Sequence, residues 1–120
     1  MLVDDDKFLL DMYATKFTER KFDVVAVFGA AEAISKLEDG LSPDIILTDI
    51  VMPAMDGFEF LAAIKEKKLA QNSRIIVLSN LGQQEDLDRA LSLGAKGYIV
   101  KATSTPSEVV EKVLEIVEKN

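Results

Sequence analysis

Oxygen-bearing side chains and one lysine follow the apolar segments of this 120-residue chain. Asp4 and Asp5 end the first apolar run, and Asp49 ends the run "DIILTD". Ser79 ends "RIIVLS", and Lys101 directly follows "GYIV". Carboxylates are hard ligands that suit Mg²⁺, while a hydroxyl and an ammonium group can bind phosphoryl oxygens. If the fold brings these residues together, they predict a site for a divalent metal and a phosphoryl group.

Several other chemistries are excluded by what the sequence lacks. It has no histidine and no cysteine, so the usual general base, the commonest zinc ligand and the thiolate nucleophile are all missing. The natural nucleophile is then a carboxylate, which can form an acyl phosphate. Gly97, Lys101 and Thr103 do not have Walker spacing, and no G-x-G-x-x-G motif is present. Nucleotide phosphate loops are therefore not expected.

Length and composition predict one soluble domain over residues 1–120. A hydrophobic content of 48% is sufficient for a core. With 14 basic and 21 acidic residues the net charge is −7, which argues against nucleic acid or an anionic membrane as a direct partner. No signal peptide or membrane-spanning run is evident, so a cytoplasmic location is expected.

Strand-like and helix-like patterns alternate along the chain. We expect strands at 1–4, 23–28, 44–49, 74–79 and 97–100, and helices at 7–20, 30–40, 55–68, 83–94 and 105–119. Nearly continuous apolar strands between amphipathic helices are typical of a parallel sheet covered on both faces. The fold class is thus α/β, a doubly wound five-stranded sheet, because a (β/α)₈ barrel needs about 250 residues.

Helix starts are also visible in the sequence. Asp56 with Glu59, and Thr105 with Glu108, have capping-box spacing, and Asp6 is the candidate N-cap of the first helix. The last helix is expected to bury one stripe of residues, namely Val109, Val110, Val113, Leu114 and Val117.

The position of the site follows from the fold. In doubly wound sheets ligands bind beyond the carboxyl ends of the strands, where the strand order reverses. With the common order 2-1-3-4-5, the first and third strands are neighbours at that point. Each candidate residue alone has an ordinary explanation, such as a polar loop residue or a solvated lysine. Their joint occurrence at one edge of the sheet carries the prediction.

Four segments carry a resemblance to a known family: "LVDDD", "DIILTDIVMPAMDG", "IIVLS" and "GYIVK". Over essentially its full length, the chain resembles the receiver domain of two-component response regulators. The resemblance implies a flavodoxin-like (CheY-like) fold and a signalling module rather than a metabolic enzyme. It also implies that a sensor histidine kinase or a histidine phosphotransfer protein supplies the phosphoryl group.

The resemblance assigns roles to the residues at the sheet edge. Asp49 is the implied phospho-acceptor. Asp5 and Asp49 would bind Mg²⁺, with Asp4 assisting and the backbone carbonyl of Val51 as a further ligand. Lys101 would pair with the acceptor carboxylate and then with the phosphoryl oxygens.

A switch is implied as well. Ser79 would donate to the bound phosphoryl group, and Tyr98 matches the aromatic residue that turns inward as this hydroxyl moves. The surface formed by the fourth helix, fifth strand and fifth helix would then bind a downstream effector protein or domain. Dimerisation through this surface on phosphorylation is a further expectation.

Two positions depart from the family pattern. Ala102 follows Lys101, where the family commonly has proline and often a cis bond. A cis bond before a residue other than proline costs about 2.5–4 kcal/mol, so we predict a trans bond here. Asn80 follows Ser79, where the family often has a small residue, and its larger side chain predicts slow phosphoryl turnover.

Three other functions fit the same residues less well. A Mg²⁺-dependent phosphatase with an aspartate nucleophile usually has a second acid two residues later, but Val51 stands there after Asp49. A pure interaction domain that keeps the fold without phosphorylation would be indicated by loss of a site acid or of the lysine, and the sequence retains both. A flavin carrier needs a hydroxyl- and glycine-rich loop after the first strand, which is absent.

Overall fold

A computed structural model describes residues 1–80 and 82–119, in which strands and helices alternate. The strands are β1 (Leu2–Val3), β2 (Ala26–Val27), β3 (Ile45–Thr48), β4 (Arg74–Ser79) and β5 (Gly97–Val100). The helices are α1 (Lys7–Glu19), α2 (Ala30–Glu38), α3 (Gly57–Glu66), α4 (Gln84–Ser92) and α5 (Pro106–Lys119). A short 3₁₀ turn, η1 (Lys101–Thr103), directly follows β5.

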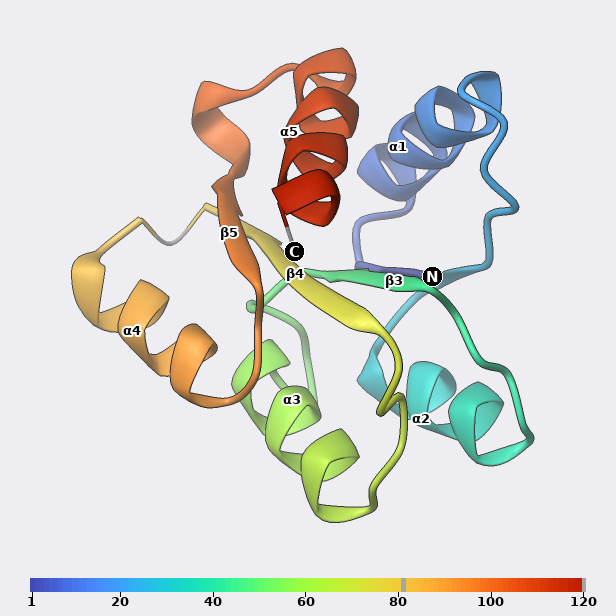
Figure 1. Cartoon of the computed structure of the whole chain (residues 1–120), viewed down its shortest axis with the longest axis vertical. Helices are drawn as coiled ribbons and strands as arrows, with labels where there is room; N and C mark the ends of the chain where they lie inside the picture. Colours follow the sequence, from blue (N-terminus) through green and yellow to red (C-terminus); the bar gives the residue numbers. More distant parts are fainter. Residues whose placement is uncertain (81, 120) are drawn as a thin grey trace.

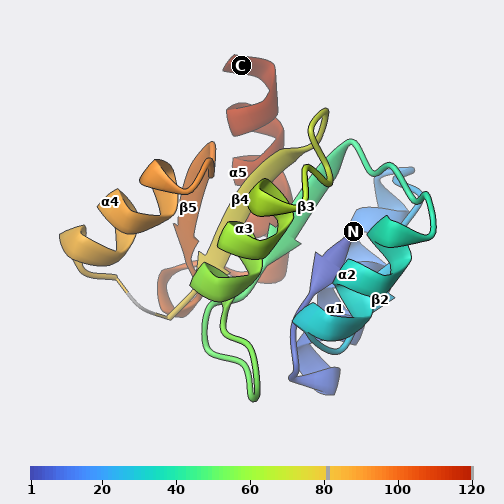
Figure 2. The same ribbon diagram turned by 90° about the horizontal axis from the view of Figure 1, so that it is seen from below.

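The strands form one parallel sheet in the order β2-β1-β3-β4-β5, which confirms the predicted fold class. Helices α1 and α5 cover one face, and α2, α3 and α4 cover the other (Figure 1). Seen from below, α4 lies at the β5 end of the sheet and α2 lies at the β2 end (Figure 2). Strand order therefore reverses at β1 and β3, where the loops after these strands lead to helices on opposite faces.

The sheet separates two apolar clusters. One lies under α2, α3 and α4 and includes the fully buried Phe60 and Leu61. The other lies under α1 and α5 and includes Leu10, Val109 and Val113. Each such side chain contributes about 1.5–3 kcal/mol on burial, which more than offsets the loss of its rotamer freedom. This packing holds the strands rigidly, and with them the residues at the strand ends.

The predicted helix caps are present. The Asp6 side chain accepts from the Leu9 amide at 3.1 Å and caps α1. Asp56 and Glu59 form the reciprocal capping box at α3. At α5 the Thr105 hydroxyl accepts from the Glu108 amide, and the Glu108 carboxylate accepts from the Thr105 amide. These caps satisfy amides that the first helical turn leaves free, so they determine where three loops end.

The predicted length of β2 and the predicted extent of the buried stripe of α5 were wrong. β2 covers only Ala26–Val27 instead of residues 23–28, because it pairs with β1 alone and that strand is itself two residues long. In α5, Val109, Val110 and Val113 are buried as predicted, but Leu114 and Val117 are only half-buried. These two side chains pack at the margin of the α1–α5 cluster rather than inside it.

Helix α4 is held to the rest of the molecule by few buried side chains. Of its residues only Ala90 is buried, and Leu91 remains 46% exposed. The Arg89 guanidinium lies 4.2 Å from the ring centroid of Phe58, at the start of α3. This cation–π contact adds about 0.5–1 kcal/mol at an exposed site, so α4 is attached more weakly than the other helices of that face.

The partly buried amino group of Met1 predicts a pH dependence of stability. It donates to the Ile45 carbonyl at 2.8 Å, and burial lowers its pKa from 8.0 to about 6, with the charge of Asp44 opposing the shift. Between these values the unfolded chain binds more protons, so the free energy of unfolding should rise with pH. We expect a gain of about 2 kcal/mol from pH 6 to pH 8 in urea titrations of the 120-residue chain.

The control for this prediction is the same chain acetylated at Met1. The sequence has no histidine or cysteine, the side chains that ordinarily titrate in this range. Acetylation removes the titrating group, so the stability of the acetylated chain should stay level over the same pH range. An equal slope in both chains would assign the pH dependence to another group.

Candidate functional site

Strand register places two of the predicted acids next to each other. In the β1–β3 ladder Val3 lies opposite Thr48, so the next residues, Asp4 and Asp49, leave the two strands side by side. The Asp49 amide donates to the Val3 carbonyl at 2.9 Å and extends this ladder by one bond. Both residues are buried, with 4% of the surface of Asp4 and 8% of that of Asp49 exposed.

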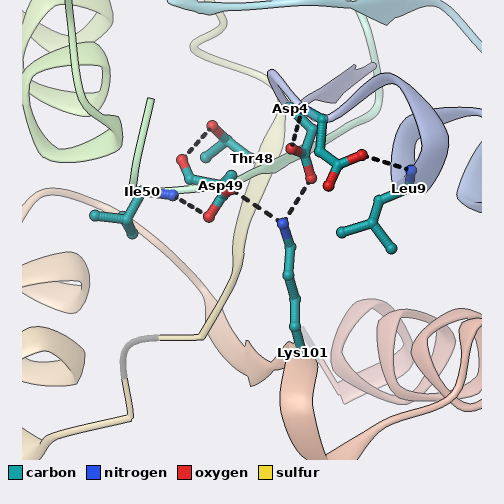
Figure 3. Close-up of polar contacts among 7 residues, drawn as sticks. Asp4, Leu9, Thr48, Asp49, Ile50 and Lys101 are labelled. Atoms are coloured by element: carbon teal, nitrogen blue, oxygen red, sulfur yellow. Dashed lines mark hydrogen bonds and ion pairs between the residues drawn. The ribbon is translucent and has the colours of Figure 1, made fainter. Parts of the chain in front are cut away.

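Lys101 joins these two acids. Its Nζ lies 2.7 Å from Asp4 Oδ2 and 3.0 Å from Asp49 Oδ2 (Figure 3). β5 lies two strands away from β3, a separation of about 10 Å, so only a long side chain at this position can reach both carboxylates. The lysine side chain is itself only 8% exposed. We call Asp4, Asp49 and Lys101 the buried charge triad.

The electrostatics of the triad keep its lysine charged. Burial alone would lower the pKa of Lys101, but hydrogen bonds and charge interactions with Asp4 and Asp49 outweigh it and raise this pKa above its ordinary value of 10.5. Two carboxylates and one ammonium group leave a formal charge of −1 in a nearly dry site. Such an excess of negative charge favours the binding of a further cation.

The remaining polar atoms around Asp49 are also bonded. Its Oδ1 accepts from the Ile50 amide at 2.7 Å, and its backbone carbonyl accepts from the Thr48 hydroxyl at 2.9 Å. The buried Thr48 was missed in the sequence, because a β-branched residue in a strand gives no sign of a polar role. These bonds fix the orientation of the carboxylate, with Oδ2 toward Lys101.

The three consecutive acids after β1 lie in different environments. Asp4 turns inward to the triad, and its Oδ1 accepts from the Asp6 amide at 3.0 Å. Asp6 caps α1, and Asp5 is exposed between them. Asp4, Asp5 and Asp49 each offer an oxygen within 4.8 Å of the others. Three hard oxygen donors with one side open to solvent fit Mg²⁺, which keeps several waters and binds through few carboxylates.

Ser79 and Tyr98 lie together on the neighbouring strands. Ser79 ends β4 and is fully buried, while Tyr98 lies in β5 and is half-buried. Burial raises the pKa of Tyr98, as does the charge of Asp86, while a hydrogen bond with Ser79 opposes the shift. The phenol therefore stays protonated at neutral pH and is coupled to the hydroxyl at the end of β4.

Gly57, the first residue of α3, packs directly against the backbone that follows β3. Its amide donates to the Ile50 carbonyl at 2.7 Å. A Cβ at this position would lie 2.4 Å from the carbonyl oxygen of Asp49 and 2.7 Å from Cα of Ile50. The sequence indicates only a helix cap at the neighbouring Asp56, because such a close approach between two backbones leaves no local pattern.

The rim of the site contains the other residues that the sequence singled out. Val51 follows two residues after Asp49 in the β3–α3 loop, with its side chain 63% exposed. Asn80 is exposed just beyond β4. The Lys101–Ala102 bond is trans, as predicted, and lies within η1.

Comparison with known proteins identifies the family. Residues 1–114 match the family model described as response regulator receiver domain. The chain is 38% identical over 118 residues to the chemotaxis protein CheY of Thermotoga maritima, covering 97% of this chain and 94% of that protein. The chain belongs to the response regulator receiver domain family and is a signalling module.

Two further similarities describe the range of this family. The chain is 38% identical over 106 residues to the uncharacterized transcriptional regulatory protein YcbL of Bacillus subtilis, covering 87% of this chain but 44% of that protein. The structure of the Vibrio cholerae chemotaxis protein CheY4 superimposes with a TM-score of 0.86 at 24% identity, over 96% of this chain and 94% of that one. This second likeness concerns the fold. Among residues 1–80 and 82–119, no helix has the length and apolar character needed to cross a membrane.

Proposed function

We propose that the chain accepts a phosphoryl group on Asp49 from a phosphohistidine of a sensor histidine kinase or histidine phosphotransfer protein. A carboxylate oxygen of Asp49 attacks the phosphorus, a P–O bond forms, the P–N bond breaks, and its electron pair returns to the imidazole of the donor. The observation that carries this proposal is the buried charge triad, which holds Asp49 at the end of β3 with Oδ2 bonded to Lys101.

Lys101 stabilises the charge that develops during this transfer. Its ammonium group is already held between Asp4 and Asp49, so it needs only a small displacement to contact an incoming phosphoryl oxygen. Charge-assisted hydrogen bonds of this kind are about twice as strong as neutral ones. The bond from the Ile50 amide keeps the other carboxylate oxygen in place meanwhile.

The acidic cluster is the proposed Mg²⁺ site. Asp5 and Asp49 would bind the ion, with Asp4 assisting and the Val51 carbonyl as a further ligand. A bound Mg²⁺ supplies positive charge that offsets the repulsion between the carboxylates and the phosphoryl oxygens. Without it, the two acids and the incoming group would repel each other in a buried site where solvent screens charge poorly.

The proposed switch couples Asp49 to a surface formed by α4, β5 and α5. A phosphoryl group adds about −1.5 to −2 charges and several acceptor oxygens. The Ser79 hydroxyl would turn to donate to it and would give up its bond with Tyr98, which is then free to change orientation. The altered surface would regulate a downstream protein or domain, or a second copy of this chain. The weak attachment of α4 favours such a change.

Intact mass after incubation with acetyl phosphate and Mg²⁺ tests the proposal. The wild-type chain should gain one phosphoryl group, and Asp49→Asn should gain none, because an amide oxygen is a poor nucleophile and forms no stable acyl phosphate. Omission of Mg²⁺ should also prevent the gain. An equal gain in Asp49→Asn would place the acceptor elsewhere, and no gain in the wild type would argue against an active receiver.

The size of Asn80 predicts the lifetime of the phosphorylated state. This exposed side chain next to Ser79 should hinder the water that hydrolyses the acyl phosphate. Asn80→Ala is therefore expected to accelerate dephosphorylation by roughly threefold to tenfold, equal to at most about 1.4 kcal/mol in activation free energy. Phosphoryl loss after removal of acetyl phosphate measures this rate, and an unchanged rate would show that Asn80 does not limit access.

A further inference from the structure

Tyr13 of α1 is a buried polar residue to which the proposed function assigns no role. It is only 4% exposed and belongs to the apolar cluster under α1 and α5. Side chains on a helix tilt toward its N-terminus, so the ring of Tyr13 covers the preceding turn and approaches the end of β1. It lines a cavity of about 10 Å³ together with Asp4, Leu10, Thr48 and Asp49. Tyr13 therefore lines the same small space as two members of the buried charge triad, Asp4 and Asp49.

Electrostatic coupling agrees with this position. Burial raises the pKa of Tyr13, the charge of Lys101 opposes the shift, and Asp4, Asp49 and Asp6 add to it. The phenol thus responds to all three members of the triad. At neutral pH the phenol remains protonated, so its hydroxyl can donate a hydrogen bond.

The proposed transfer requires the triad to exchange partners. In the resting state Asp4 Oδ2 accepts from Lys101 at 2.7 Å, and Asp4 Oδ1 accepts from the Asp6 amide. Once the ammonium group of Lys101 turns to a phosphoryl oxygen, Asp4 Oδ2 loses this partner. A Mg²⁺ ion bound with the assistance of Asp4 would offset part of its charge, but Oδ2 would still lack a hydrogen-bond donor, and it is too deeply buried for bulk water to supply one freely.

We infer that Tyr13 is a positioning residue whose hydroxyl donates to Asp4 when Lys101 moves to the phosphoryl group. This inference rests on the proposed transfer to Asp49 and concerns the regulation of that same site. The phenol stabilises the phosphorylated state and contributes little to the resting state, in which Asp4 is already bonded. Phenylalanine would fill nearly the same space but could not donate.

Binding of beryllofluoride with Mg²⁺, a mimic of the phosphorylated state, tests the inference. Tyr13→Phe keeps the ring and removes the donor, so its resting thermal stability should equal that of the wild type, while its affinity for beryllofluoride falls about tenfold. Tyr13→Leu removes the ring as well, so it should lose resting stability and also bind weakly. Wild-type affinity in Tyr13→Phe would overturn the inference, even if Tyr13→Leu bound weakly, because the role would then be packing.

A ¹⁹F NMR measurement distinguishes a role of the Tyr13 hydroxyl from a role of its ring in packing. The chain has two tyrosines and no tryptophan, so 3-fluorotyrosine labelling gives two ¹⁹F resonances, and Tyr13→Phe assigns one of them. The Tyr13 resonance should shift when beryllofluoride and Mg²⁺ are added to the wild type. A resonance that stays in place while beryllofluoride binds would overturn the inference. Failure of the wild type to bind beryllofluoride would instead count against the proposed function.

Discussion

Replacing Lys101 with methionine should lower the free energy of unfolding at pH 7 by about 3–5 kcal/mol in the absence of Mg²⁺. Methionine fills much of the same volume, so the loss is mainly electrostatic. Two carboxylates with side-chain exposures of 6% and 10% would remain near each other with no cation between them. Urea titration measures the effect, which should depend little on salt because these charges are too buried for efficient screening.

A matched control is Lys67→Met. Lys67 also forms an ion pair, with Glu38 at 3.4 Å, but both side chains are about half exposed. Pairs of this type contribute about 0–1 kcal/mol, so the control should be nearly neutral. Added Mg²⁺ should restore more stability to Lys101→Met than it adds to the wild type, because the ion replaces the missing charge. Equal stability of both lysine variants would mean that the buried charge triad contributes nothing net to folding.

Gly57→Ala should be the second severe substitution, with a loss of about 3 kcal/mol or more in the free energy of unfolding. The new methyl group would meet backbone atoms of Asp49 and Ile50 at 2.4 and 2.7 Å, well inside contact distance. Backbone cannot turn away as a flexible side chain can, so the β3–α3 loop must shift. Because that loop carries the acceptor, phosphorylation by acetyl phosphate should slow as well.

The control for this prediction is Gly29→Ala. A Cβ on Gly29 meets no atom within 4 Å, and the φ of 179° there is an extended conformation that alanine adopts readily. This variant should stay within about 0.5 kcal/mol of the wild type. If Gly57→Ala were equally mild, the acceptor loop would be more adaptable than its contacts indicate.

The element order and the edge of the sheet that carries the site could be predicted because the pattern behind them is local. Apolar runs that end at Asp4, Asp49 and Lys101 define strand ends, and parallel strands bring their carboxyl ends to one edge. Strand length was less predictable. The β-branched run at 23–28 looks like a full strand, but its ladder depends on the length of β1, which is a property of another segment.

Details of the site depend on contacts between distant segments and left no sign in the sequence. The bond of Lys101 with Asp4, and the approach of Gly57 to Asp49, each require the completed register of the sheet. Thr48 and Tyr13 resemble ordinary strand and helix residues, and only their neighbours in space give them polar surroundings. Residue type and spacing therefore predicted which side chains lie at the same edge of the sheet. The hydrogen bonds between them and their orientations depend on tertiary packing.

Helix α4 is attached by few buried contacts, so it should open locally more often than the strands of the sheet. Amide hydrogens exchange with solvent through partial openings whose free energies depend on the buried contacts that must be broken. Ala90 is its only buried residue, and the exposed Arg89 contacts the ring of Phe58, so α4 should open far more often than β3 or β4. Its amides should exchange early, while those of the strand that holds Asp49 should exchange only on global unfolding. The chain would thus combine rigid strands that hold the acceptor with a helix, α4, that opens readily and can respond to its phosphorylation.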